Sequence, residues 1–127
     1  MKSNYKSDGE FWVSPYNYAE AVRKSMELPE SVSIHDATLR DGEQTPGIVL
    51  RKADKVEIAC KLSEVGVERI EAGMPAVSEQ DFQAIKDIGK ENLSSKIYTF
   101  ARAITGDIDK ALECGAHGIV LEVPIGY

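Results

Sequence analysis

Positive charge is scarce in this chain of 127 residues. Lysine and arginine number 15 against 21 aspartate and glutamate residues, so the formal net charge is −6. A chain of this sign repels phosphate backbones, and no run of basic residues offsets that repulsion. We therefore do not expect nucleic acid as a partner.

Long apolar stretches are also missing. No segment approaches the roughly 20 apolar residues that cross a bilayer, and the N-terminal MKSNYKSDGE has no apolar core of a signal peptide. These absences favour a cytoplasmic chain without membrane attachment. The two cysteines, Cys60 and Cys114, form no Cys-x-x-Cys motif and stand within helical apolar patterns, which predicts reduced, buried thiols.

A regular alternation of apolar patterns is present. With 43% hydrophobic and 28% charged residues, the composition is that of a soluble globular protein of about one domain. Continuous apolar runs predict strands, and helical spacing bounded by capping residues and glycines predicts helices between them. The expected strands are 32–39, 67–73, 96–103 and 118–124, and the expected helices are 56–65 ending at Gly66, one capped by Ser78, and one capped by Asp107 and ending at Gly115.

Strands separated by helices must run parallel, because each crossover returns the chain to the same end of the sheet. The carboxyl ends of all four strands then meet on one face, which carries the chemistry of parallel α/β folds. The charged segment HDATLRDGEQTPG at 35–47 lies at that face, and so do Glu71, Arg102 and Glu122. We expect the functional site there.

The segment at 35–47 resembles the first-strand signature D-x-T-L-R-D-G-x-Q of metal-dependent acyltransferases and lyases built on a TIM barrel. That family includes 2-isopropylmalate, homocitrate and citramalate synthases, with hydroxymethylglutaryl-CoA lyase as a more distant relative. Two later segments, RIEAGMPAVSEQD (69–81) and FARAITGDIDKALECG (100–115), resemble the family's second strand and its third strand and helix. The resemblance covers roughly residues 30–120 and implies an α/β fold, the N-terminal half of a (β/α)8 TIM barrel with four parallel strands.

The resemblance also implies an activity, the condensation of acetyl-CoA with a 2-oxo acid, assisted by a divalent metal ion (Mg, Mn or Zn). On this basis Asp41 is a metal ligand. Arg40 is a catalytic residue that stabilises the negative charge growing on the carbonyl oxygen, a role that suits the fixed charge and planar fork of a guanidinium. Glu71 is a second candidate catalytic residue, because the family places a carboxylate there in the substrate pocket. Gln44 faces the keto acid.

Two further residues are assigned to substrate binding. Arg102 could clamp a substrate carboxylate, or it could support Glu71 or Asp41. Phe100 favours a shorter or branched apolar keto acid, since family members that take a longer dicarboxylic one can carry a histidine in that part of the strand. Phe100 could instead only fill the barrel interior. Composition does not identify the keto acid.

Structural interpretations stay open for the charged residues. Taken alone, the Arg40-Asp41 dipeptide could be a solvated salt pair. Asp36, inside a strand, is expected to orient Arg40 or a neighbouring backbone group. Glu71 could form an ion pair with Arg69 or Arg102.

Histidine is nearly absent. His35 and His117 are the only two, and the His-x-His pair that the family's metal site takes from the second half of the barrel does not occur. Both histidines are therefore interpreted as packing or solvated residues. A complete barrel takes about 250 residues, so we interpret the chain as half a barrel, either truncated or completed by a second chain. Alone, it is expected to self-associate through open sheet edges and to be inactive.

The expected domain organisation is an N-terminal arm, residues 1–30, with a short helical stretch at 18–28, followed by the barrel half, residues 31–127. The arm is rich in aromatic residues that could pack on the chain itself or against a second subunit. Three functions remain open at this point: the synthase, a carbon–carbon lyase of the hydroxymethylglutaryl-CoA lyase type, and a non-catalytic half-barrel assembly subunit. The expected partners are the 2-oxo acid, acetyl-CoA, and either further copies of the chain or a half that carries His-x-His.

Overall fold

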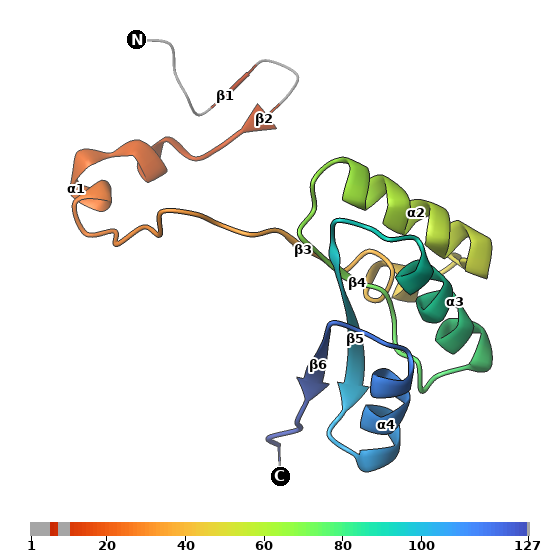
Figure 1. The fold of residues 1–127 in the computed structure, drawn as a ribbon. Coiled ribbons are helices and arrows are strands. Elements are labelled where there is room, and N and C mark those ends of the chain that lie inside the picture. The colour runs from red at the N-terminus through yellow and green to blue at the C-terminus, as the bar shows by residue number, and fades with distance from the viewer. Residues whose placement is uncertain (1–5, 8–10, 127) are drawn as a thin grey trace. The chain divides into compact units, whose positions relative to one another are not determined.

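The computed structural model describes residues 6–7 and 11–126, and contacts divide the chain into two units, residues 1–32 and 33–127. Figure 1 labels the elements. In order they are β1 (Lys6–Ser7), β2 (Phe11–Trp12), the 3-10 helix η1 (Pro15–Tyr18), α1 (Glu20–Arg23), β3 (His35–Asp36), the 3-10 helix η2 (Gly42–Gln44), α2 (Lys52–Glu64), β4 (Arg69–Glu71), α3 (Glu79–Lys90), β5 (Lys96–Arg102), α4 (Thr105–Glu113) and β6 (Gly118–Glu122).

The first unit contains little regular structure. Strands β1 and β2 pair antiparallel, and the predicted helical stretch over 18–28 is reduced to the four residues of α1. Neither η1 nor α1 buries a residue, and so short a helix gains little from propensity alone. Two aromatic residues of the arm, Trp12 and Tyr16, are exposed. A third, Tyr5, lies outside the described residues.

The second unit is a parallel α/β arrangement. Its sheet has the order β3-β4-β5-β6, and every neighbouring pair of strands is parallel. Helices α2, α3 and α4 alternate with the strands along the chain and lie together on one side of the sheet (Figure 1). The predicted α/β fold of four parallel strands with intervening helices is confirmed.

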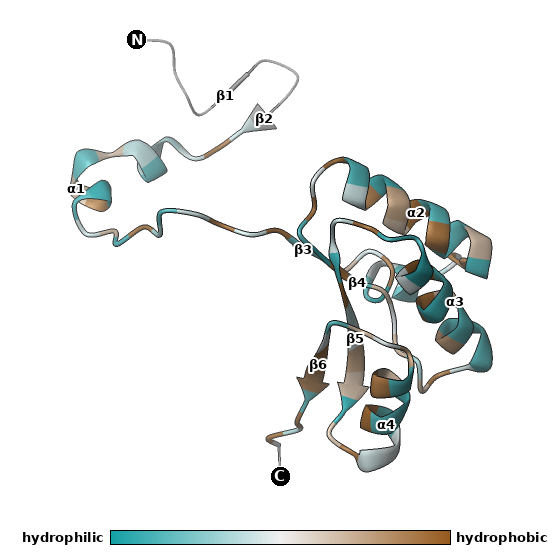
Figure 2. Ribbon diagram, viewed as in Figure 1, coloured by the Kyte–Doolittle hydropathy of each residue, from teal (hydrophilic) through white to brown (hydrophobic). Residues whose placement is uncertain are grey.

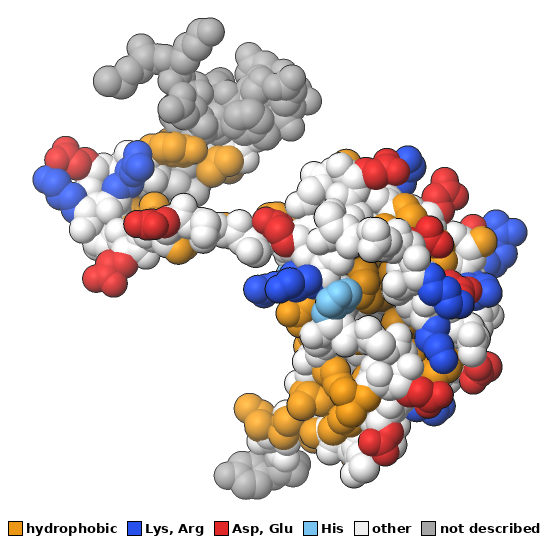
Figure 3. All heavy atoms as spheres, viewed as in Figure 1, with side chains coloured by type: hydrophobic (Ala, Val, Ile, Leu, Met, Phe, Trp, Pro, Cys, Tyr) orange, Lys and Arg blue, Asp and Glu red, His pale blue; other side chains and the backbone are white. Residues whose placement is uncertain are grey.

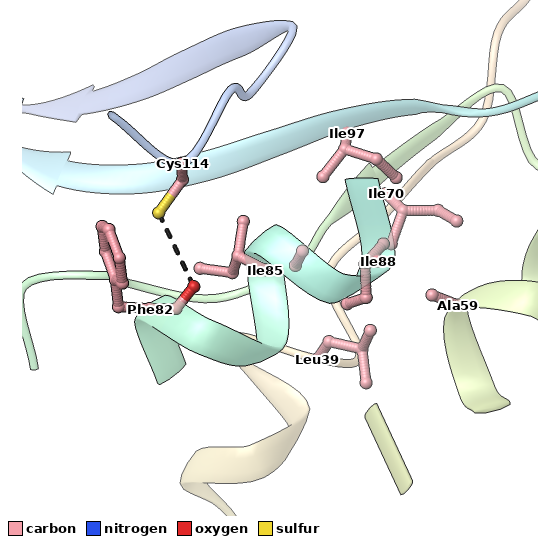
Figure 4. Close-up of a cluster of buried hydrophobic side chains, with 9 residues drawn as sticks. Leu39, Ala59, Ile70, Phe82, Ile85, Ile88, Ile97 and Cys114 are labelled. Carbon is pink, nitrogen blue, oxygen red and sulfur yellow. Dashed lines mark hydrogen bonds between the residues drawn. The ribbon is translucent and has the colours of Figure 1, made fainter. Parts of the chain in front are cut away.

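Apolar side chains between the helices and the sheet form the core. Phe82, Ile85 and Ile88 of α3 are buried together with Ile70 of β4 and Ile97 of β5 (Figure 4). Three further members of this cluster complete the labelled group, namely Leu39, Ala59 of α2 and Cys114. The apolar face of α3 therefore holds the helix layer on the strands.

The two cysteines differ in burial. Cys114 is buried, as predicted, with its thiol near the carbonyl oxygen of Phe82, and burial raises its pKa to about 11. Cys60 is only half-buried, so the prediction of burial is wrong for this residue. Both thiols are free.

Several predicted boundaries are corrected. Helix α2 begins at Lys52 rather than at 56, and β4 and β6 are shorter than the expected 67–73 and 118–124. The first strand keeps only His35–Asp36 of the expected 32–39, because the chain turns directly after Asp36. Helix α4 begins at Thr105 with Ile104 as its N-cap, so Asp107 is not the cap. The Asp107 carboxylate instead accepts hydrogen bonds from the Arg102 guanidinium, a stronger charge-assisted interaction than capping by a neutral donor.

The face of the sheet opposite the helices carries the other set of strand side chains. Tyr98 lies opposite Gly118 in the strand register, where a Cβ on Gly118 would stand 2.3 Å from the Tyr98 ring, so a larger residue would require the ring to move. Strand β6 and the segment after it are apolar (Figure 2), and hydrophobic atoms gather there on the surface (Figure 3). The exposed members are Leu121, Val123 and Ile125.

No helix among residues 6–7 and 11–126 is both long and apolar enough to cross a bilayer.

Candidate active site

The segment after β3 is a tight turn built around Asp36. The Asp36 carboxylate accepts hydrogen bonds from the Thr38 backbone N–H (2.9 Å) and the Thr38 hydroxyl (3.0 Å). This contact confirms that Asp36 orients a neighbouring backbone group. Leu39 is fully buried in the core, which anchors the turn and places the next residue, Arg40, at the carboxyl ends of the strands.

The Arg40 guanidinium is held on three sides. Its Nε donates to Glu71 Oε1 at 2.7 Å, and its Nη1 donates to Asp41 Oδ1 at 2.8 Å. The central carbon of the guanidinium lies 4.7 Å from the centroid of the Phe100 ring, within cation–π range. The hydrogen bond to Glu71 raises the pKa of Arg40 above its ordinary value despite partial burial. The group is therefore a fixed positive charge with a set orientation.

Glu71 is the buried partner in this network. Its side chain is 4% exposed, and its oxygens contact Arg40 and, at 3.4 Å, Nε2 of His35. The ion-pair alternative for Glu71 names Arg69 or Arg102 as the partner, and both are wrong. The reason is topological, because β3 and β4 are adjacent and the turn after β3 brings Arg40 over the end of β4.

Asp41 lies at the solvent side of Arg40. Its side chain is 67% exposed and one carboxylate oxygen, Oδ1, accepts from Arg40. A carboxylate suits Mg²⁺ or Mn²⁺, so Asp41 fits as one ligand. Within the described part of the chain, however, no group of three or more His, Cys, Asp or Glu side chains could hold a metal ion. These residues alone do not make a metal site, and further ligands would have to come from elsewhere.

A cleft of about 550 Å³ opens beside this network. Arg40 and Phe100 line it together with Gln44, as expected for residues that face a substrate. Gln44 is exposed at the end of η2, which follows directly from the Asp36 turn. The structure thus brings Arg40 and Gln44 of the motif and Phe100 of β5 to one cleft, whereas Asp41 and Glu71 do not line it. The chemical roles of these residues stay predictions.

Arg102 also lines the cleft, but it does not support Glu71 or Asp41. Its Nε and Nη2 donate to the two oxygens of Asp107 at 2.7 and 3.0 Å. The Arg102 side chain remains 57% exposed, and Glu122, its register partner on β6, lines the same wall. The supporting role for Glu71 or Asp41 is therefore wrong, and the substrate clamp stays a prediction.

The two histidines make different contacts. His117 accepts a hydrogen bond at Nδ1 from the Ile97 backbone N–H (3.0 Å), a structural role as predicted. His35 packs against the Tyr98 ring, with 5.4 Å between centroids, and also contacts Glu71. His35 is therefore a packing residue that touches the charged network.

Sequence reasoning missed one cluster at the cleft wall. Lys55 of α2 is buried and its ammonium group contacts both Glu43 and Asp81, two residues that line the cleft. A signal was present, because Lys55 stands one helical turn before Ala59 and two before Ser63, on the face that α2 buries. A lysine on a buried helix face requires an acidic partner.

A family model described as HMGL-like matches residues 31–126. The chain belongs to the HMGL-like family. Homocitrate synthase AksA of Methanopyrus kandleri is 49% identical over 107 residues, which are 84% of this chain and 26% of that protein. A probable 2-isopropylmalate synthase of Ignicoccus hospitalis is 50% identical over 103 residues (79% and 26%), and the (R)-citramalate synthase CimA of Methanocaldococcus jannaschii is 53% identical over 93 residues (73% and 19%).

Membership in the HMGL-like family confirms the resemblance on which the barrel interpretation rests. The chain spans about a quarter of the length of the curated relatives that it matches. Four parallel strands alternating with helices are consistent with part of a (β/α) barrel.

Proposed function

We propose that this chain supplies the N-terminal part of an active site that condenses acetyl-CoA with a 2-oxo acid. The observation that carries the proposal is the Arg40 guanidinium, held by Glu71, Asp41 and Phe100 at the wall of a cleft. The names of the relatives, homocitrate, isopropylmalate and citramalate synthases, support the same reaction class.

Arg40 acts as the oxyanion stabiliser. Its contacts with Glu71 and Asp41 use one hydrogen on each nitrogen, and Nη1 and Nη2 each carry a second hydrogen that is available to a ligand. Once a base has removed a proton from the methyl group of acetyl-CoA, the resulting enolate attacks the 2-oxo carbon, a C–C bond forms and the carbonyl π electrons move onto the oxygen, where negative charge grows. A guanidinium that is already oriented stabilises this charge without reorganising. Hydrolysis of the product thioester by water then releases CoA.

Glu71 acts in this scheme by orienting Arg40, because its two oxygens face the guanidinium at 2.7 and 3.5 Å. Asp41 is proposed as one metal ligand, with the remaining ligands in a second half that carries His-x-His. A bound divalent ion would polarise the 2-oxo group as a Lewis acid. The roles proposed for Arg40 and Glu71 do not depend on the geometry of this ion.

Substrate selection is assigned to the other residues that line the cleft. Gln44 and Arg102 present polar groups suited to the carboxylate of the 2-oxo acid. Phe100 places an aromatic face beside Arg40 and favours an apolar substituent on the keto acid.

We also propose a cytoplasmic setting and assembly either as a homo-oligomer or with a complementary half. We propose no nucleic-acid or membrane partner.

A completed chain tests the proposal. All 127 residues are joined to the part of the Methanopyrus kandleri homocitrate synthase that follows the matched segment, and release of free CoA from acetyl-CoA is measured with a panel of 2-oxo acids. We expect CoA release that depends on one of these acids. Cleavage of a hydroxyacyl-CoA without condensation would favour the lyase, and a folded fusion with neither activity would favour the assembly subunit.

The chain without that second half provides the matched control. We expect it to self-associate on a sizing column and to release no CoA. In the described structure β6 pairs with β5 on one edge, and β6 and the segment after it expose apolar residues. A monodisperse, active monomer would contradict the half-barrel interpretation.

A further inference from the structure

The buried ammonium group of Lys55 is not explained by the proposed chemistry. The Lys55 side chain is 2% exposed, and it extends from the face of α2 that packs inward with Ala59 and Ser63. Lysine is almost never fully buried unless it is paired, so the role of Lys55 depends on its partners.

Those partners come from two other elements. The Lys55 ammonium group donates to Glu43 Oε2 at 2.6 Å and to Asp81 Oδ1, so it joins η2 to α3. Burial lowers the pKa of Lys55, but the hydrogen bonds to Asp81 and Glu43 outweigh that effect, and the pKa lies above its ordinary value. Lys55 is therefore a permanently charged link between three elements.

The carboxylates are themselves anchored. Asp81 Oδ2 accepts from the Ser78 hydroxyl at 2.6 Å, and Ser78 caps α3. Glu43 Oε1 accepts from the Leu50 backbone N–H at 3.3 Å, which closes the segment between η2 and α2. A shift of Lys55 would therefore be transmitted to two residues that line the cleft, Glu43 and Asp81.

Lys55 stands behind two residues of the cleft wall. Glu43 and Asp81 line the cleft whereas Lys55 does not, and Gln44 follows Glu43 directly in the chain. Without Lys55, two carboxylates from different elements would repel each other next to the surface that receives a substrate anion.

We propose that Lys55 is a positioning residue of the active site, which fixes Glu43 and hence Gln44 against α3 and offsets the negative charge of Glu43 and Asp81 for the carboxylate of the 2-oxo acid. This inference rests on the proposed function. On this inference, α2 affects how tightly the keto acid binds, although Lys55 itself does not line the cleft.

The test replaces Lys55 in the completed chain. Lys55→Met keeps a similar length without the charge, and we expect the KM for the 2-oxo acid to rise about tenfold or more, with the KM for acetyl-CoA unchanged. Lys52→Met is the matched control, because Lys52 stands on the same helix but is half exposed and pairs with Asp87, away from the cleft. Lys52→Met should leave both KM values unchanged.

A second readout does not require activity. Hydrogen–deuterium exchange over residues 43–50 should quicken in Lys55→Met and not in Lys52→Met, since Glu43 would lose the ammonium group that fixes it. If the unsubstituted completed chain releases no CoA, the proposed function fails, while the exchange still tests the link.

Glu43→Gln is the variant to use if Lys55→Met does not fold. It retains the Lys55–Asp81 contact and weakens the contact that reaches η2, so we expect faster exchange over residues 43–50. The KM for the 2-oxo acid should rise by only about threefold, because loss of the Glu43 charge partly offsets the loss of positioning. Unchanged KM values in the folded variants, with only melting temperature or yield reduced, would show that the cluster is merely structural and would overturn the proposal. So would unchanged exchange over 43–50.

Discussion

Two arginines at the strand ends line the same cleft but are held in different ways. Arg40 contacts Glu71 from the neighbouring strand, Asp41 from its own turn and the Phe100 ring from β5, and its side chain is 23% exposed. Among the described residues, Arg102 forms an ion pair with Asp107, five residues later, and its side chain is 57% exposed. A group held from several elements is preorganised, whereas a group held locally can move to meet a ligand.

Under the proposed function, this difference favours separate tasks for the Arg40 end and the Arg102 end of the cleft, meaning the groups around each arginine. The Arg40 end is suited to charge that develops during the reaction, because its geometry is set before the substrate arrives. The Arg102 end is suited to binding a carboxylate that is already charged. Substitutions at each end should therefore change different kinetic constants, and all are measured in the completed chain.

Asp41→Asn has the largest expected effect. If Asp41 is a metal ligand, loss of its charge should abolish metal-dependent turnover and weaken metal binding in calorimetry while the fold is retained, since the side chain is exposed. Asp107→Asn is the matched change at the other end and should leave metal binding unchanged. Normal turnover of Asp41→Asn at saturating metal would remove Asp41 from the metal site.

Arg40→Lys comes next. Lysine keeps the charge but loses the fork that engages Glu71 and Asp41, so we expect kcat to fall about 10²-fold or more with little change in stability. Steady-state kinetics and thermal melting measure the two quantities. Reduced stability with normal turnover per folded molecule would support a purely structural salt pair.

Glu71→Gln should have a smaller effect. The amide still accepts a hydrogen bond from Arg40 but no longer carries charge, so we expect kcat to fall about tenfold with the KM for the 2-oxo acid nearly constant. Glu122→Gln is the control, because Glu122 also lines the cleft but lies beside Arg102 in the strand register. Equal losses of kcat in the two variants would contradict the division between the two ends.

Arg102→Gln is expected to have the smallest effect, confined to binding. Loss of the guanidinium should raise the KM for the 2-oxo acid about fivefold with kcat nearly unchanged. A fall in kcat as large as that of Arg40→Lys would show that both arginines act on the reacting atoms, and the comparison between the two ends would fail.

The fold was largely predictable from local pattern. Ser78 caps α3 as expected, and Gly66 follows α2 with a φ of +89°, the left-handed conformation that terminates helices. The extents of β3 and α1 were wrong because hydrogen bonding at Asp36 and the lack of a packed face override apolar pattern. Asp107 failed as a cap because Arg102, close to it in the fold, is a stronger partner.

The candidate site was predicted as a set of residues, without its pairings. The motif at 35–47 and the shared direction of the strands indicated that Arg40, Gln44 and Arg102 belong to one face, and all three line the cleft. Phe100, which the resemblance assigned to substrate binding, lines it too, whereas Asp41 and Glu71 do not. Which acid pairs with which base was not predicted, because the ion-pair alternative for Glu71 named Arg69 or Arg102, whereas Glu71 contacts Arg40. Lys55 was missed because its partners lie 12 residues before it, in η2, and 26 residues after it, in α3.

By itself, the sequence determined the order of strands and helices, the parallel direction of the sheet and the residue types at its carboxyl ends, because these follow from short-range periodicity and chain connectivity. Only the tertiary structure decided the ion pairs that tie Arg40 to Glu71 and Lys55 to Glu43 and Asp81. Such pairs depend on distances of a few ångströms between elements remote in the chain, and packing of the core around Leu39 and Ile70 sets those distances.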